Sequence, residues 1–193
     1  LPEGFSKPLV IDLYEVSSSK EHQYDLSYYY LGHLISTNID YMAHTSQRTQ
    51  LGTANGYQYL WKEAEGKQKE NENNAFMTFL NGNRFYTITN VSGTDDPDYY
   101  FNRIGANDPN FNLRNEPSFM IREKGESMFF ISIIEPHGEF NPREEYTIQP
   151  VSNIQAIKLD QTDEKNKLIE IKTKDNKTIR VTLSAGNYSV SVE

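Results

Sequence analysis

Short runs in which apolar and polar residues alternate follow one another along most of the chain. Residues 7–16 read KPLVIDLYEV, and runs of the same kind occupy residues 24–37 and 57–63. A period of two is typical of a β-strand that buries one of its faces. Gly32 interrupts the second run, which indicates a bulge or a pair of strands rather than one regular strand.

The loop Asn81-Gly82-Asn83 separates two further apolar runs, residues 75–80 and 84–91. An Asn-Gly step between two alternating runs is the strongest short-range signal of a β-hairpin. No stretch shows convincing helical periodicity, and turn signals recur at the close spacing of a many-stranded protein. The sequence therefore predicts an all-β protein, built as an antiparallel β-sandwich.

The pattern becomes simpler from Val151 onward. Residues 151–159, 167–173 and 178–183 read as three short alternating strands that are joined by polar turns, with Lys and Glu on the outer face. We therefore predict a main β-sandwich portion in residues 1–150 and a small β-meander in residues 151–193, and we assign no chemistry to the meander.

Composition narrows the classes of partner. The 193 residues carry a formal net charge of −8 and no Lys/Arg-rich run, which argues against nucleic acid and anionic membrane as partners. The four histidines lack metal-binding spacing and there is no cysteine, so the sequence indicates no metal site. No signal peptide or spanning helix is recognisable. The 13 tyrosines suit half-buried sheets and also suit surfaces that bind sugars.

Two irregular polar loops are the best candidates for a binding site. Residues 105–117 and 134–142 are rich in Asn, Asp, Gly and Pro, and two strongly apolar runs, residues 118–122 and 127–134, lie between them. We interpret these runs as a hairpin of core strands that brings both loops to one end of a sheet. The side chains singled out for substrate, cleft or interface contact are Asn107, Asp108, Asn110, Arg114, Glu135 and His137.

These residue types suit the recognition of an acidic sugar. Arg and Asn can clamp a carboxylate, and His can transfer protons near neutral pH. The same side chains could equally serve only to cap their own turns. Nucleophile-elbow, phosphate-loop and calcium-loop motifs are absent, and no residue can be assigned a catalytic role.

Several ordered blocks nevertheless resemble one family. They are residues 22–25 (HQYD), 32–34 (GHL), 51–61 (LGTANGYQYLW), 83–87 (NRFYT), 105–114 (GANDPNFNLR), 116–117 (EP) and 135–142 (EPHGEFNP). Together they resemble the C-terminal β portion of oligoalginate lyases, the alginate-degrading heparinase II/III-like polysaccharide lyases of family seventeen. The resemblance covers about residues 7–142.

The resemblance implies a fold and an activity for a longer protein. Family members carry an α/α-barrel followed by a β-sandwich and cleave alginate oligomers exolytically by β-elimination. A Tyr and a His of the barrel transfer the protons, and some members hold zinc through His and Asp early in the β region. This sequence has no counterpart of the barrel or of that early region, so we carry over no catalytic or metal residue and expect the chain alone to be inactive.

The resemblance also implies partners and a location. We expect the missing α/α-barrel domain and an acidic oligosaccharide, alginate, as partners, a homo-oligomer as a further one, and a periplasmic or secreted location. If a helical domain normally covers this chain, residues 7–37 should leave an apolar face or a sheet edge open.

Two other readings stay open at this point. The chain could be a free-standing carbohydrate-binding module, with Tyr57, Tyr59 and Trp61 on one exposed strand face. It could also be a structural or oligomerisation domain whose strand edges pair with another chain.

Overall fold

The computed structural model describes residues 4–94, 96–105, 115–161, 166–184 and 187–193. Strands account for nearly all of its regular structure, and the described residues contain no α-helix, which confirms the all-β prediction. The elements are β1 (Val10–Tyr29), β2 (His33–Thr37), β3 (Ile39–Ala43), the 3-10 turn η1 (Tyr57–Tyr59), β4 (Leu60–Gln68), β5 (Ala75–Asn81), β6 (Arg84–Val91), β7 (Asp98–Ile104), β8 (Pro117–His137), β9 (Glu139–Asn141), β10 (Tyr146–Ile148), β11 (Ile154–Gln161), β12 (Asn166–Thr173), β13 (Thr178–Ser184) and β14 (Asn187–Val192).

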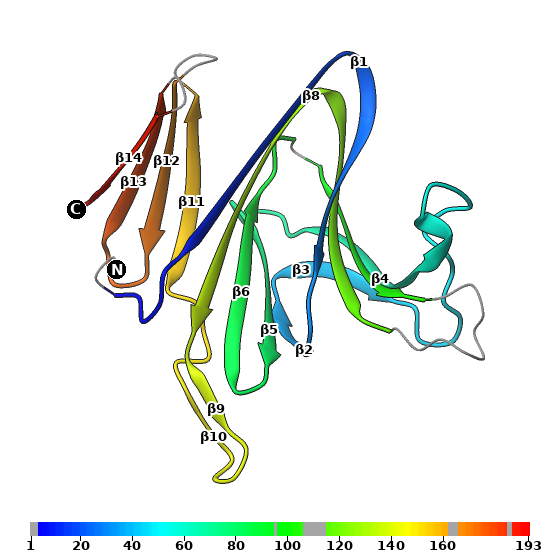
Figure 1. The fold of residues 1–193 in the computed structure, drawn as a ribbon, viewed down its shortest axis with the longest axis horizontal. Coiled ribbons are helices and arrows are strands. Elements are labelled where there is room, and N and C mark those ends of the chain that lie inside the picture. The colour runs from blue at the N-terminus through cyan, green and yellow to red at the C-terminus, as the bar shows by residue number, and fades with distance from the viewer. Residues whose placement is uncertain (1–3, 95, 106–114, 162–165, 185–186) are drawn as a thin grey trace.

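Two long bent strands organise the large sheet. β8 pairs with β7 through residues 117–122 and with β6 through residues 131–137, while β1 follows β8 along both parts. Figure 1 shows β1 and β8 turning over together, so that the sheet folds back on itself. The first layer contains β2, β5, β6 and the second half of β8 with the first half of β1. The second layer contains β3, β4, β7 and the other halves of β8 and β1.

The predicted hairpin of core strands between residues 118 and 134 was therefore wrong. Its polar middle reads as a turn, yet it stays extended, because β1 continues to pair with β8 there: Gln23 lies opposite Lys124 and His22 opposite Gly125. The register of β1 shifts between Ser17 and His22, opposite this polar middle of β8. Polar residues occur at this point because the bend faces solvent, and the chain does not reverse.

An apolar core fills the space between the two layers. Met77, Ile88 and Phe130 from the first layer meet Tyr99 and Phe119 from the second, and each is at most 3% exposed. The Tyr28 hydroxyl of the second layer also donates to a carboxylate oxygen of Asp12 in the first, at 3.0 Å. This face-to-face packing is the β-sandwich that the sequence predicted.

The four strands β11 to β14 form a separate antiparallel sheet, called the C-terminal sheet below. Its Ile157, Ile169 and Ile171 pack against Ile131 and Ile133 of β8, on the outer face of the first layer. The sequence predicted three of these strands and missed β14, whose residues are all exposed. In the chain, β9 and β10 come between the large sheet and the C-terminal sheet, and they form a short hairpin that projects at the bottom of Figure 1. The Asn-Gly hairpin between β5 and β6 is confirmed.

Candidate functional site

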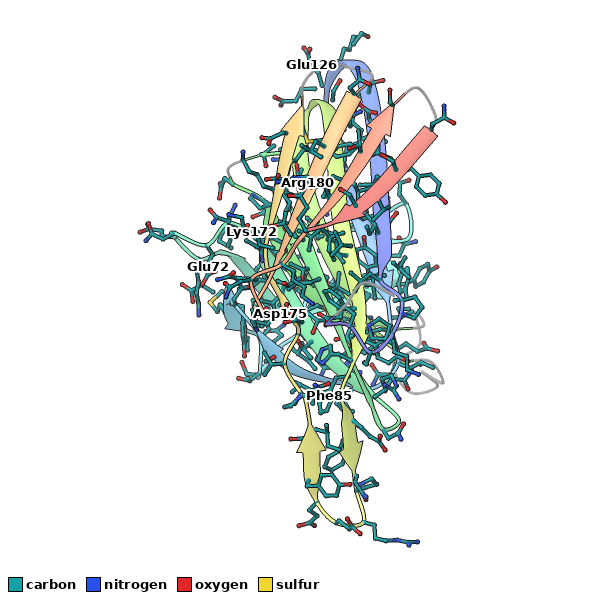
Figure 2. All side chains as sticks on the ribbon, turned by 90° about the vertical axis from the view of Figure 1, so that its left-hand side faces the viewer. Glu72, Phe85, Glu126, Lys172, Asp175 and Arg180 are labelled. Atoms are coloured by element: carbon teal, nitrogen blue, oxygen red, sulfur yellow. The ribbon has the colours of Figure 1, made fainter. Side chains whose placement is uncertain are left out.

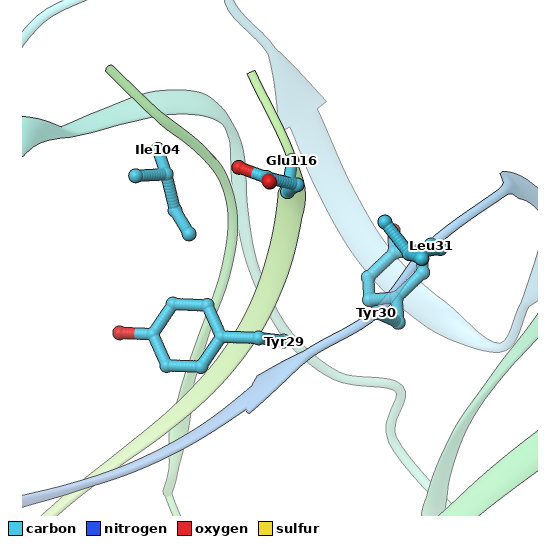
Figure 3. Close-up of a pocket in the computed structure, with 5 residues that line it drawn as sticks. All are labelled: Tyr29, Tyr30, Leu31, Ile104 and Glu116. Carbon is cyan, nitrogen blue, oxygen red and sulfur yellow. The ribbon is translucent and has the colours of Figure 1, made fainter. Parts of the chain in front are cut away.

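An open pocket lies at the base of the first polar loop. Tyr29, Tyr30, Leu31, Ile104 and Glu116 line a cavity of about 560 Å³ (Figure 3). Tyr29 and Leu31 are each 60% exposed, so the pocket has an apolar, partly aromatic rim. The candidate residues Asn107, Asp108, Asn110 and Arg114 lie outside the described residues.

Backbone hydrogen bonds fix the ends of that loop. The Ile104 amide donates to the Glu116 carbonyl at 3.0 Å, which continues the β7–β8 ladder by one step. The Gly105 amide donates to the Tyr59 carbonyl at 2.7 Å and so ties β7 to the segment before β4. On the other side of the pocket, Gly32 has φ of +109°, and a Cβ placed there would lie 1.9 Å from the Leu80 carbonyl oxygen. Only glycine fits this turn between β1 and β2.

Two buried polar side chains lie next to the pocket. Asn102 and Ser118 are each 1% exposed, and the Asn102 amide and Ser118 hydroxyl have no hydrogen-bond partner among the described residues. Ser118 pairs with Asn102 on one side and with Tyr29 on the other, so all three side chains share the outer face of the second layer with Ile104. Unpaired buried polar groups cost free energy, and both side chains are enclosed by their neighbours and not open to the pocket.

A charged cluster lies farther along the same face. Arg122 makes a two-pronged ion pair with Asp25, with Nε and Nη2 each 2.8 Å from a carboxylate oxygen. The Tyr57 hydroxyl also donates to Asp25, and the guanidinium lies 4.9 Å from the centre of the Tyr100 ring. The hydrogen bonds to Asp25 raise the pKa of Arg122. The pKa of Tyr57 is also raised, mainly because the phenol is partly buried and next because it donates to the Asp25 carboxylate. The cluster therefore holds the segment around η1 against the sheet in a fixed charge state.

This cluster was not recognised as a unit in the sequence. Asp25 and Tyr57 fall in the blocks that carry the family resemblance, but nothing in the local pattern connects either of them to Arg122. The ion pair joins residues 97 positions apart, and only the β1–β8 register places them opposite each other.

The second polar loop lies at the other end of β8, on the outer face of the first layer. Glu135 is 2% exposed, and it accepts hydrogen bonds from the Ser152 hydroxyl and, at 3.1 Å, from the Asn153 amide. These bonds anchor the segment that leads into the C-terminal sheet. Glu135 therefore has a structural role in this chain, whatever else contacts it.

His137 is equally enclosed. Its Nδ1 lies 3.0 Å from the Gln149 carbonyl oxygen, and a carbonyl can only accept, so Nδ1 carries a proton. Its Nε2 lies 2.8 Å from the Thr87 hydroxyl, which in turn lies 2.7 Å from the Thr78 hydroxyl. Both ring nitrogens are thus engaged within the fold.

Glu135 and His137 line a different cavity from the one at the first loop, of about 370 Å³, together with residues 149–153 and 174–175. The described parts of the two polar loops therefore do not share a pocket. Whether Asn107, Asp108, Asn110 and Arg114 join Glu135 and His137 in one site stays a prediction. Among the described residues, no group of three or more His, Asp or Glu side chains is placed to hold a metal ion, and no helix is long and apolar enough to cross a membrane.

The aromatic row expected of a carbohydrate-binding module does not form. Tyr57 and Tyr59 belong to η1, and only Trp61 lies in β4. The strand predicted for residues 57–63 was wrong at its start, because Asn55 and Gly56 adopt positive φ and lead into a 3-10 turn. Tyr57 points to Asp25 while Tyr59 is 41% exposed, so the three rings do not make one platform.

The comparisons with known proteins agree with the family resemblance. No family model matches the chain. It is 40% identical over 152 residues to a protein named alginate lyase from Stenotrophomonas maltophilia, a match that covers 78% of this chain and 20% of that protein. It is 31% identical over 188 residues to a protein named exo-oligoalginate lyase from Saccharophagus degradans, covering 96% of this chain and 25% of that protein. The chain thus spans a quarter or less of the curated relatives it matches, and these matches fit a C-terminal portion of oligoalginate lyases.

Proposed function

We propose that this chain is the C-terminal β-sandwich portion of an alginate lyase-like protein. In this proposal it supports the substrate cleft of an exolytic β-elimination enzyme, and an α/α-barrel outside the chain supplies the catalytic groups. Both relatives carry names that refer to alginate cleavage, and both are at least four times as long as the matched segment. We also propose a periplasmic or secreted location and a zinc ion held upstream of this chain, both of which rest only on what the family resemblance implies.

The observation that carries the proposal is the open apolar surface beside the first pocket. Tyr29 and Leu31, at and just after the end of β1, line the pocket and are each 60% exposed, and Leu34 and Ile35 in β2 are 39% and 48% exposed. Clustered exposed apolar side chains of this kind mark interaction surfaces. The pocket at the base of the first polar loop opens beside this surface, so a domain that covers it would form a cleft against the loop.

The described polar side chains support a positioning role better than proton transfer. Both nitrogens of His137 and the carboxylate of Glu135 are engaged inside the fold. The Tyr57 phenol, with its raised pKa, donates to Asp25 and is a poor base near neutral pH. We therefore assign the proton transfers to the barrel, and the binding of the uronate carboxylate in part to the first polar loop, where Arg114 supplies a cation.

The test compares the 193-residue chain with the longer polypeptide that carries it. Elimination creates an unsaturated uronate, whose absorbance in the ultraviolet reports turnover of alginate oligomers. We expect turnover only from the longer polypeptide, and we expect Leu31→Lys to lower its turnover by about tenfold or more, because the charge disrupts an apolar interface. Ile148→Lys, at a 49% exposed position on the β9–β10 hairpin, is the matched control.

Turnover by the 193-residue chain alone would contradict the proposal. So would a longer polypeptide in which Leu31→Lys and Ile148→Lys behave alike. Thermal unfolding of each variant in the isolated chain separates an interface effect from a folding defect, since both positions are exposed there.

A further inference from the structure

The first half of β1 is an open sheet edge. Residues 10–17 pair with β8 on one side, and no described strand pairs with them on the other. Alternate backbone N–H and C=O groups of β1 therefore face outward along this stretch. Such an edge is a ready template for an added strand.

The C-terminal sheet has an uncovered apolar face on the same side of the molecule. Tyr188, Val190 and Val192 of β14 lie directly opposite Leu183, Val181 and Ile179 of β13, so they share the face that packs on the large sheet. The β13 partners are largely buried in that interface. Tyr188, Val190 and Val192 nevertheless remain 78%, 53% and 44% exposed. An apolar face turned toward the core side but left open indicates that something normally lies beneath it.

The alignment of the two sheets explains why β14 is uncovered. β11 lies against β6, and Lys167 of β12 places its ammonium 4.9 Å from the ring centre of Phe129 in β8 and 2.8 Å from the Glu15 carboxylate in β1. Strands in both sheets are spaced by about 4.8 Å. Four strands of the C-terminal sheet thus lie over three strands, β6, β8 and β1, and β14 extends past the edge. Figure 2 draws β14 in front, on the side of the molecule where β1 runs.

We propose that the free edge of β1 and the uncovered face of β14 form one docking site for an extended segment from the remainder of the lyase-like polypeptide. This segment would add a strand beside residues 10–17 and place alternate apolar side chains against Tyr188, Val190 and Val192. The inference rests on the proposed function. The matched relatives supply the reason for this occupant, because this chain corresponds to only 20% and 25% of their lengths, so each relative has ample polypeptide beyond the matched segment.

Hydrogen–deuterium exchange tests the site directly. In the isolated chain, the amides of residues 10–17 that face away from β8 should exchange quickly. In the longer polypeptide they should exchange about tenfold more slowly or better, because a paired strand protects them. Val190→Lys in the longer polypeptide should restore fast exchange in β1, and Tyr188→Lys is a second variant in case the first impairs folding. Ile148→Lys is the control and should change nothing in β1.

Each outcome decides the matter. Equal exchange of residues 10–17 in the isolated chain and the longer polypeptide overturns the proposal, as does the absence of any longer polypeptide. Protection in the isolated chain that accompanies a dimer in light scattering overturns it too, because a second copy is then the occupant. Lyase activity does not enter this readout: protection without activity would refute the proposed function alone, and activity without protection would refute only the docking site.

Discussion

Replacing Asp25 by Asn would leave the Arg122 guanidinium buried without its counter-ion. The two side chains are 14% and 7% exposed for Arg122 and Asp25, so water can compensate little of the lost charge. Removing one partner of a buried ion pair typically costs about 3–5 kcal/mol of folding free energy. Because the guanidinium retains the faces of Tyr100 and Tyr57, at 4.9 and 5.8 Å, we expect the lower end, about 3 kcal/mol.

Urea unfolding, followed by circular dichroism, measures this loss. The double variant Asp25→Asn with Arg122→Met should recover part of it, because no uncompensated charge remains. Tyr57→Phe, which removes one hydrogen bond to the carboxylate but keeps the ion pair, should cost about 1–2 kcal/mol. A change below about 0.5 kcal/mol for Asp25→Asn, the size of an ordinary surface substitution, would refute the reasoning that this pair is buried and holds the η1 segment in place.

Three further outcomes follow from single contacts. Gly32→Ala should destabilise the fold by more than about 2 kcal/mol, since its Cβ would meet the Leu80 carbonyl at positive φ; a silent variant in thermal unfolding would refute the turn. Burial raises the pKa of Glu123 in the folded protein. Its protonated form therefore contributes its full stability below the pKa that Glu123 has in the unfolded chain. This contribution is lost as the pH rises through the higher pKa of Glu123 in the folded protein. Glu123→Gln should accordingly gain stability relative to the native chain as pH rises from about 4 to 7, and an unfolding free energy with a constant difference across that range would contradict this. Thr87→Val should cost about 1–3 kcal/mol in urea unfolding by leaving a nitrogen of buried His137 unpaired, whereas an unchanged midpoint would show that the hydrogen-bond chain is unimportant.

Local patterns were enough to predict much of the sandwich. Alternation of apolar and polar residues predicted the strands that bury one face, and the Asn81-Gly82 step predicted the β5–β6 hairpin, because both signals depend only on neighbouring residues. The bend of β8 was missed for the converse reason. Its polar middle resembles a turn, and only pairing with β1, about a hundred residues away in the chain, keeps it extended. β14 was missed although residues 188–192 (YSVSV) alternate apolar and polar side chains as a strand does.

The candidate site shows the same limit. Glu135 and His137 were predicted to contact the substrate, the cleft or an interface, and this stays a prediction. Their burial and their bonds to Ser152, Gln149 and Thr87 depend on where the C-terminal sheet packs. The Asp25–Arg122 pair is likewise set by strand register. Residue types suggested the recognition of an acidic sugar, which stays a prediction, whereas the contacts of individual side chains follow from long-range pairing that a single sequence does not show.

The most direct test of the account is functional complementation. The 193-residue chain and the separately produced remainder of the polypeptide would each be assayed alone and then mixed, with the absorbance of unsaturated uronate as the readout. The account predicts little turnover of alginate oligomers by either part and a clear gain on mixing. Full activity of the remainder without this chain, or activity of this chain by itself, would contradict it.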